Sequence, residues 1–149
     1  MPANTVPIFS LAPRTSWGTL NGDDGAAGPI TTAQISKDGT GVTPAPTTIF
    51  TAGAQGSFIQ EVRIRVIGSN ASATVMRLFI NNGSVHTTIA NNILIDEISI
   101  PITTLSETAA QNCYSIPCNF ALPASYKLMV TFGTGGAAGW RVSAIGSDY

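Results

Sequence analysis

The chain has 149 residues, a net charge of -1 and a charged content of only 10%, well below the roughly 25% of an average soluble domain. This length suits a single domain with its own core, so we expect one domain over residues 1–149 that needs no disulfide framework. The low charge argues against nucleic-acid binding, and no stretch approaches the about 20 apolar residues of a membrane helix.

The predicted elements are short strands in which polar and apolar residues alternate. In chain order they cover residues 7–11, 16–20, the region of Phe50, 61–66, 75–80, 93–100, 120–122, 126–132 and 140–144. Val62, Ile64 and Val66, for example, face one side of their strand, and Arg63 and Arg65 face the other. This period of two is typical of a sheet with one buried face. Helical spacing is rare, so we expect an all-β fold, an antiparallel β-sandwich that is jelly-roll-like.

The connections are marked by glycine, proline and asparagine. Asn82-Gly83 follows the strand 75–80 and favours a two-residue hairpin turn. The Gly/Ala-rich residues 133–139 are expected to form a hairpin loop between the last two strands. The segment 21–46 is rich in Gly, Pro, Thr and Asp and has too little apolar content to join the core. We therefore expect a long loop or arm there.

The residue types that catalysis needs are sparse. His86 is the single histidine, and with two cysteines it cannot complete a four-ligand zinc site. Asp23 and Asp24 lack EF-hand spacing, so a solvated loop is favoured over a calcium site. For Cys113 and Cys118, reduced thiols are favoured over a bridge, because a strand would hold them too far apart to bond. We expect no enzyme activity, metal or cofactor.

A group of outward-facing residues on two strands is the candidate contact surface. It comprises Arg63, Arg65, Val75, Arg77 and Phe79. Two interpretations stay open: a solvated face with a few weak ion pairs, or a subunit contact, since arginine and aromatic residues are enriched in interfaces. On the second interpretation, Phe79 points away from the core because a partner covers it.

Several stretches, spread over nearly the whole chain, carry a family resemblance. They are PANT (2–5), KDGTG (37–41), FTAGA (50–54), FINNGS (79–84), LPASYK (122–127) and the end from AAGW (137–140) to DY (148–149). Together they resemble small all-β bacteriophage virion structural proteins of the capsid decoration, or cement, type. The stretch 21–35 is longer than in that family pattern.

The resemblance implies a capsid decoration subunit that binds the shell of major capsid protein and stabilises it. The alternative is a tail- or fibre-associated module that binds the host or a glycan. We expect a homo-oligomer, with a trimer favoured over a dimer, because closed symmetry covers apolar positions that a monomer exposes. Residues 21–46 would reach neighbouring subunits. Residues 1–10 do not have the pattern of a signal peptide, so we expect synthesis in the host cytoplasm and a final location in the virion.

Overall fold

The computed structural model describes residues 12–18, 30, 33–34, 36–42, 45–69, 72–136 and 138–149. In these residues the chain forms strands and one short 3-10 helix. They are β1 (Ala12–Gly18), β2 (Thr47–Thr51), β3 (Ser57–Val66), β4 (Thr74–Asn81), η2 (Ile89–Asn91), β5 (Asn92–Ile100), β6 (Cys113–Leu122), β7 (Lys127–Phe132) and β8 (Trp140–Asp148). The predicted all-β class is confirmed.

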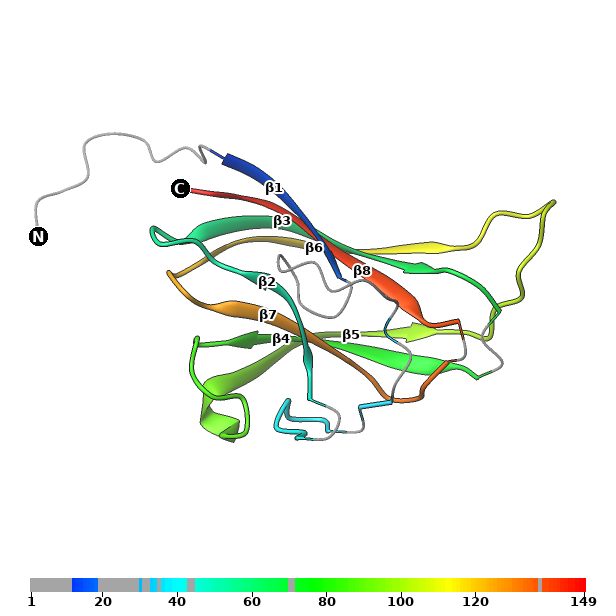
Figure 1. Cartoon of the computed structure of the whole chain (residues 1–149), viewed down its shortest axis with the longest axis horizontal. Coiled ribbons are helices and arrows are strands. Elements are labelled where there is room, and N and C mark those ends of the chain that lie inside the picture. Colours follow the sequence, from blue (N-terminus) through cyan, green and yellow to red (C-terminus); the bar gives the residue numbers. More distant parts are fainter. Residues whose placement is uncertain are drawn as a thin grey trace, which may run out of the picture.

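The strands form two four-stranded sheets that pack face to face (Figure 1). One sheet has the order β1-β8-β3-β6, the other has the order β2-β7-β4-β5, and the pairings are antiparallel. The pairs are nested, because β4 pairs with β5, β3 with β6, β2 with β7 and β1 with β8. Successive nested pairs belong to alternate sheets, which is the connectivity of a jelly roll.

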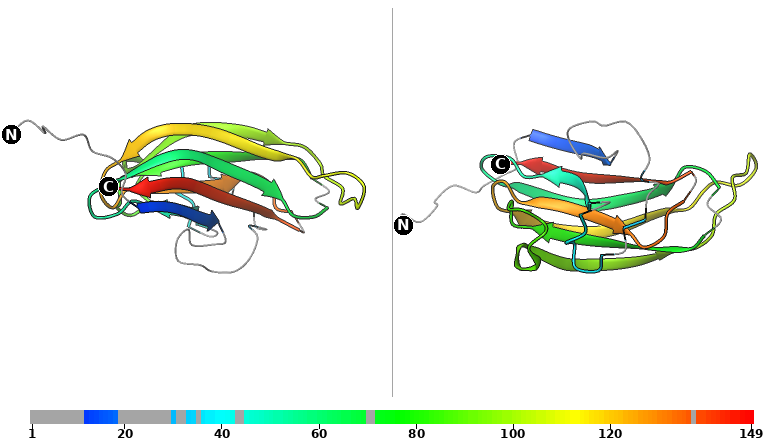
Figure 2. Two further views of the ribbon diagram at one scale, coloured as in Figure 1. Left: turned by 90° about the horizontal axis from the view of Figure 1, so that it is seen from above. Right: turned by 60° about the horizontal axis from the view of Figure 1, so that its bottom comes forward.

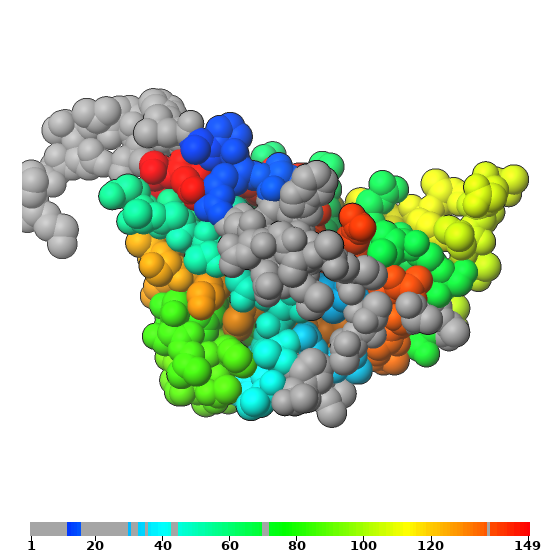
Figure 3. Space-filling view, viewed as in Figure 1, coloured from blue at the N-terminus to red at the C-terminus, as the bar shows by residue number. Residues whose placement is uncertain are grey.

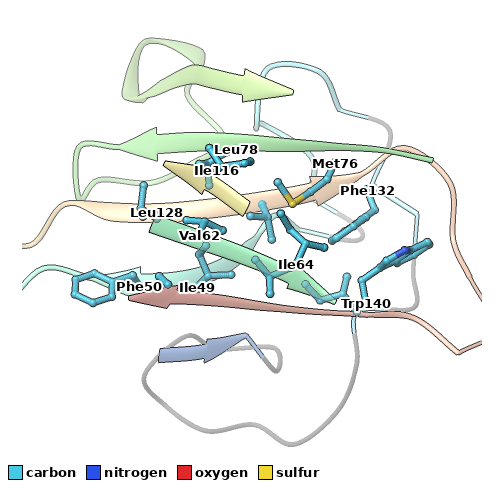
Figure 4. Packing of buried hydrophobic residues seen from close by; sticks show 14 of the residues in the cluster. Ile49, Phe50, Val62, Ile64, Met76, Leu78, Ile116, Leu128, Phe132 and Trp140 are labelled. Carbon is cyan, nitrogen blue, oxygen red and sulfur yellow. The ribbon is translucent and has the colours of Figure 1, made fainter. Parts of the chain in front are cut away.

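The core lies between the two sheets and is built from the inward side chains of the alternating strands (Figure 4). Val62 and Ile64 of β3 point into it, and both are completely buried, as their spacing predicts. Near one end, the rings of Phe132 and Trp140 stack with centroids 4.5 Å apart and an interplanar angle of 10°. Burial of one such large apolar side chain contributes roughly 1.5–3 kcal/mol, so these contacts hold the two sheets together.

Several strands differ in length from their predicted ranges. The strand predicted at 120–122 begins much earlier, since β6 runs from Cys113 to Leu122 and includes Pro117. Proline is tolerated there because β6 is the outer strand of its sheet and one of its edges needs no ladder hydrogen bonds. Strand β1 begins before the predicted strand 16–20 and contains its residues 16–18, whereas residues 19–20 and the predicted strand 7–11 lie outside the described residues.

Two predicted hairpin connections are wrong. Strand β4 ends at Asn81 and β5 starts at Asn92, so Asn82-Gly83 begins a longer loop over residues 82–91. Gly83 still needs its glycine, because its φ is +87° and an added Cβ would come within 2.8 Å of a backbone oxygen. The connection 133–139 joins β7 in one sheet to β8 in the other, so it crosses between layers.

The segment 21–46 contributes more to the domain than its composition predicts. Ile30 is only 2% exposed, belongs to the core, and pairs through backbone hydrogen bonds of 3.0 and 3.1 Å with Trp140. The expectation that this segment stays out of the core is therefore wrong at Ile30. Further along, the backbone N–H of Gln34 donates to the backbone carbonyl of Phe132 at the end of β7. Residues 21–29 lie outside the described residues.

Residues 36–42 continue across the outer face of the β2-β7-β4-β5 sheet (Figure 2, right). They reach the start of β5, where the Asn92 amide Nδ2 donates to the Asp38 carbonyl at 3.3 Å. Close by, His86 Nε2 lies 3.1 Å from the Gly41 carbonyl. Figure 3 shows this segment in cyan packed against the green loop 82–91. Part of one outer face of the sandwich is thus covered by the chain itself.

Candidate contact surfaces

The five residues of the predicted contact surface do not lie together. Arg63 and Arg65 are on β3, in the β1-β8-β3-β6 sheet. Val75, Arg77 and Phe79 are on β4, in the other sheet. Because both groups point outward from different layers, they occupy opposite faces of the molecule. The expectation that they form one surface on neighbouring strands is wrong.

Phe79 faces outward from its strand, as the alternation predicts, but it is 0% exposed. It pairs with Met129 of β7, whose outward side chain is only 3% exposed. Gln34 and Gly41 are anchored on the two sides of this pair, Gln34 at Phe132 and Gly41 at the 82–91 loop. We attribute the burial to the covering segment 36–42, which does for Phe79 what a partner was expected to do.

The other two β4 residues of the predicted surface, Arg77 and Val75, are also partly buried within their own chain. Arg77 Nε donates to Glu97 Oε1 of β5 at 2.6 Å, and only 11% of the Arg77 side chain is exposed. Val75 is half-buried beside it. These residues stabilise their own sheet, and they offer little surface to a partner.

The two β3 arginines join a third arginine that the predicted set did not contain. In the register of β3 and β8, Arg65 lies directly opposite Arg141, and Arg63 lies opposite Ser143. Around them the sheet has a hollow of about 300 Å³. It is lined by Thr15, Arg63, Arg65, Ile67, Cys113, Arg141, Ser143 and Ile145. We call it the basic hollow.

Only one of the three arginines has a carboxylate partner among the described residues. Arg63 pairs with Glu61 at 2.7 Å, and the Ser115 hydroxyl also donates to Glu61 at 2.7 Å. These hydrogen bonds, first from Ser115 and then from Arg63, hold the pKa of Glu61 below its usual value. Within the described part of the chain, Arg65 and Arg141 have no acidic neighbour in ion-pair range. The basic hollow therefore has a net positive charge.

A second surface is apolar and lies at the start of the outer strand β5 and in the 82–91 loop before it. It comprises Val85, Ile89, Ile93, Leu94 and Ile95, which are between 36% and 65% exposed, and we call it the β5 edge. Strand β5 is the outer strand of its sheet and pairs only with β4 among the described strands. Monomeric proteins usually protect such strands with charge or cover them, because unpaired edges associate. The β5 edge is therefore a candidate for burial against another protein.

A third feature is the connection from β5 to β6, residues 101–112, which projects from the end of the sandwich (Figure 1). We call it the 101–112 arm. At its base, the Thr103 hydroxyl donates to the Gly68 carbonyl at 3.2 Å, and the Leu105 amide donates to Ser69 Oγ at 2.8 Å. Ile102 and Leu105 nevertheless leave 62% and 55% of their area exposed. The arm is thus an ordered projection with apolar side chains in solvent.

The histidine and the two cysteines do not form a reactive site among the described residues. His86 contacts the carbonyl of Gly41, and no group of three metal-ligating side chains occurs in the part of the chain that the structure describes. Cys113 and Cys118 are both free, as predicted, although Cys113 is exposed and only Cys118 is packed. Burial and, secondarily, the charge of Asp96 raise the pKa of Cys118 to about 11, which keeps this thiol protonated and unreactive at neutral pH.

The strand ends are joined by a partly buried polar cluster at Asp148. Arg14 donates to both of its carboxylate oxygens at 2.9 Å, and the Ser57 hydroxyl donates at 2.5 Å. The Arg14 guanidinium also lies 4.6 Å from the centre of the Phe50 ring. Burial alone would raise the pKa of Asp148, but the hydrogen bonds from Ser57 and Arg14 outweigh it and lower the pKa. This cluster fixes β1 to β8 and β3, and we assign it to stability.

Sequence reasoning missed Arg141 and the 101–112 arm. The alternation of Trp140 and Val142 already places Arg141 on an outward side. It does not show that β8 lies beside β3, because that pairing joins residues far apart in the chain.

Among the described residues, no helix has the length and apolar content required to cross a membrane.

No family model matches this sequence, and none of the curated proteins is significantly similar to it. Similar solved structures include a chain of the T13 particle of IBDV, with 16% identity and a TM-score of 0.38. Chains from the Gx and Gt strains of infectious bursal disease virus have 13% and 18% identity and TM-scores of 0.32 and 0.31. Each match covers 93% of this chain but only 32% or 33% of the viral chain. Similarity this low carries no argument about function.

Proposed function

We propose that this chain is a non-enzymatic structural subunit of a bacteriophage virion, specifically a capsid decoration subunit that binds the assembled shell. The β5 edge is the observation that carries this proposal. Ile89, Ile93 and Leu94 are large apolar side chains left in solvent by a chain that has few charges to keep it soluble. Such a surface is stable in an assembly in which another protein covers it. The sequence resemblance to decoration proteins supports the same function.

The proposed mechanism is mass action. A subunit that binds the assembled lattice, and not free capsid protein, stabilises the lattice by the free energy of that binding. Each apolar side chain of the β5 edge can contribute up to roughly 1.5–3 kcal/mol if it becomes fully buried. A trimer presents three such edges at once, and this multivalency strengthens binding without any new contact.

The proposal is tested with shells of the encoding phage that lack this chain. Purified wild-type protein is expected to bind them saturably, in a fixed ratio to the major capsid protein. Replacing Ile89→Ser and Ile93→Ser together should weaken shell binding at least tenfold and leave the circular dichroism spectrum and oligomeric state unchanged. Val42→Ser is the matched control, because Val42 is 71% exposed but lies in the 36–42 segment.

Two outcomes would overturn the proposal. One is wild-type protein that does not bind shells at all. The other is wild-type protein found on tails or fibres of the particle, which would instead support the host- or glycan-binding alternative. A serine variant that binds shells as tightly as wild type does would also count against the proposal, because the β5 edge that carries it would then be ordinary surface.

A further inference from the structure

We propose that the 101–112 arm of one copy of this chain docks into the basic hollow of another copy. The two features have opposite charges and both expose apolar side chains. The contact does not depend on where in a virion the protein resides, so this inference is independent of the decoration role.

The basic hollow is costly for an isolated subunit. Like charges placed directly opposite on neighbouring strands are destabilising, and Arg65 faces Arg141 in this way. No described carboxylate neutralises either of them. Replacing one of the two arginines with serine or threonine would remove this repulsion and stabilise the isolated subunit. An incoming carboxylate removes this cost, because arginine forks bind carboxylates through paired N–H groups.

The arm supplies such a carboxylate at an ordered turn. Ser106 Oγ accepts hydrogen bonds from the amides of Thr108 and Ala109 at 3.2 Å, which shapes the chain around Glu107. Glu107 is exposed and has no hydrogen-bond or ion-pair partner among the described residues. The other described carboxylates accept hydrogen bonds from side chains or from the backbone: Asp38, Glu61, Asp96, Glu97 and Asp148. Glu107 is thus the described acid that remains available to a partner.

Apolar groups on the two features also match. Leu105 is exposed two residues before Glu107 on the arm. Ile67 and Ile145 line the hollow beside the arginines. A hollow of about 300 Å³ has room for a leucine side chain together with a carboxylate. Burying Leu105 against the isoleucines, with Glu107 on Arg65 and Arg141, would satisfy both features.

The occupant is a second copy, since the arm points away from its own sandwich. The arm ends at residue 112, and Cys113, the next residue, lines the hollow. The C-terminal end of the arm therefore lies at the rim of its own hollow, and the rest of the arm extends outward beyond the end of the sheets (Figure 1). In a closed ring each copy would pass its arm to the next, an arrangement that is compatible with the trimer expected from the sequence.

Charge reversal tests the contact in solution. We expect Glu107→Arg and Arg141→Glu each to weaken self-association more than tenfold in sedimentation experiments at physiological salt. The double variant, which restores an opposite-charge pair, should recover most of the association. Asp96→Arg and Lys37→Glu are controls that reverse one acid and one base elsewhere, and they should associate like wild type. If Arg141→Glu fails to fold, Arg65→Glu replaces it.

A thiol crosslink gives a second, direct readout. With Ser106→Cys, mild oxidation should join residue 106 of one copy to Cys113 of another, and Cys113→Ser should abolish the crosslink. A crosslink formed only within one chain would overturn the proposal, because the arm would then occupy its own hollow. Wild-type protein that stays monomeric at micromolar concentration would also overturn it, as would single reversals without effect or a folded double variant without recovery.

Discussion

The two outer faces of this sandwich differ, although their strands alternate polar and apolar residues in the same way. On the β2-β7-β4-β5 sheet, Phe79 is completely buried, which we attribute to the segment of the same chain that crosses this face. On the β1-β8-β3-β6 sheet, Arg65 and Arg141 remain exposed around an open hollow. The chain covers the apolar side chains around Phe79 itself and leaves the arginines of the other face in the open. An outward position in a strand therefore does not mark a contact surface until one knows what else lies over it.

The largest expected effect is at the covered face. Phe79→Ala should destabilise the protein by about 3–5 kcal/mol, because it empties a completely buried aromatic site. Urea unfolding followed by circular dichroism measures this loss. Phe58→Ala is the matched control, since Phe58 lies on β3 of the other sheet and is only half-buried. If both variants lose the same small amount, the two faces do not differ as described.

A smaller effect is expected where the covering segment is attached. Asn92 Nδ2 donates to the carbonyls of Asp38 and His86, and Asn92 Oδ1 accepts from Asn81. Asn92→Ala should cost about 1–3 kcal/mol, since it leaves partly buried groups without partners. Hydrogen exchange should also speed up in residues 36–42. Unchanged exchange there would show that the segment is held by other contacts.

The sequence predicts which side of each strand faces the core better than it predicts which strands and segments become neighbours. The inward side of β3 follows from Val62 and Ile64 alone, because the period of two depends only on neighbours in the chain. The pairing of Arg65 with Arg141 depends on which strands become neighbours, and local pattern does not contain that information. For the same reason Phe79 resembles an interface residue until the path of residues 36–42 is known. The 82–91 loop was missed because Asn82-Gly83 satisfies a local turn preference within a longer connection.

Acid should loosen the covering segment before it unfolds the sheets. Hydrogen bonds from Ser36 and Thr40 lower the pKa of Asp38 to about 2, from an ordinary value of 3.8. The folded state therefore binds fewer protons than the unfolded state in this range, and the stability due to Asp38 is present above about pH 4 and is lost as the pH falls towards 2. Asp38→Asn should remove this part of the pH dependence. Wild-type and variant stabilities that fall in parallel between pH 5 and about pH 2 would contradict it.

The smallest expected effect is at the open face. Arg65→Gln should raise the stability of the isolated subunit by about 0.2–1 kcal/mol at low salt, because it removes a like-charge pair. The gain should shrink as salt screens the two charges. Thermal unfolding at protein concentrations below self-association measures it. A loss of stability on this substitution would show that Arg65 already has a stabilising partner within its own chain.

A cryo-electron microscopy map of the purified virion tests the central claim most directly. We predict this chain on the outside of the shell, in clusters of three, with the β5 edge against the major capsid protein. In such a cluster the 101–112 arm of each copy should lie in the basic hollow of its neighbour. A map that places the chain only on tail or fibre, or that shows single copies with the β5 edge in solvent, would contradict the account.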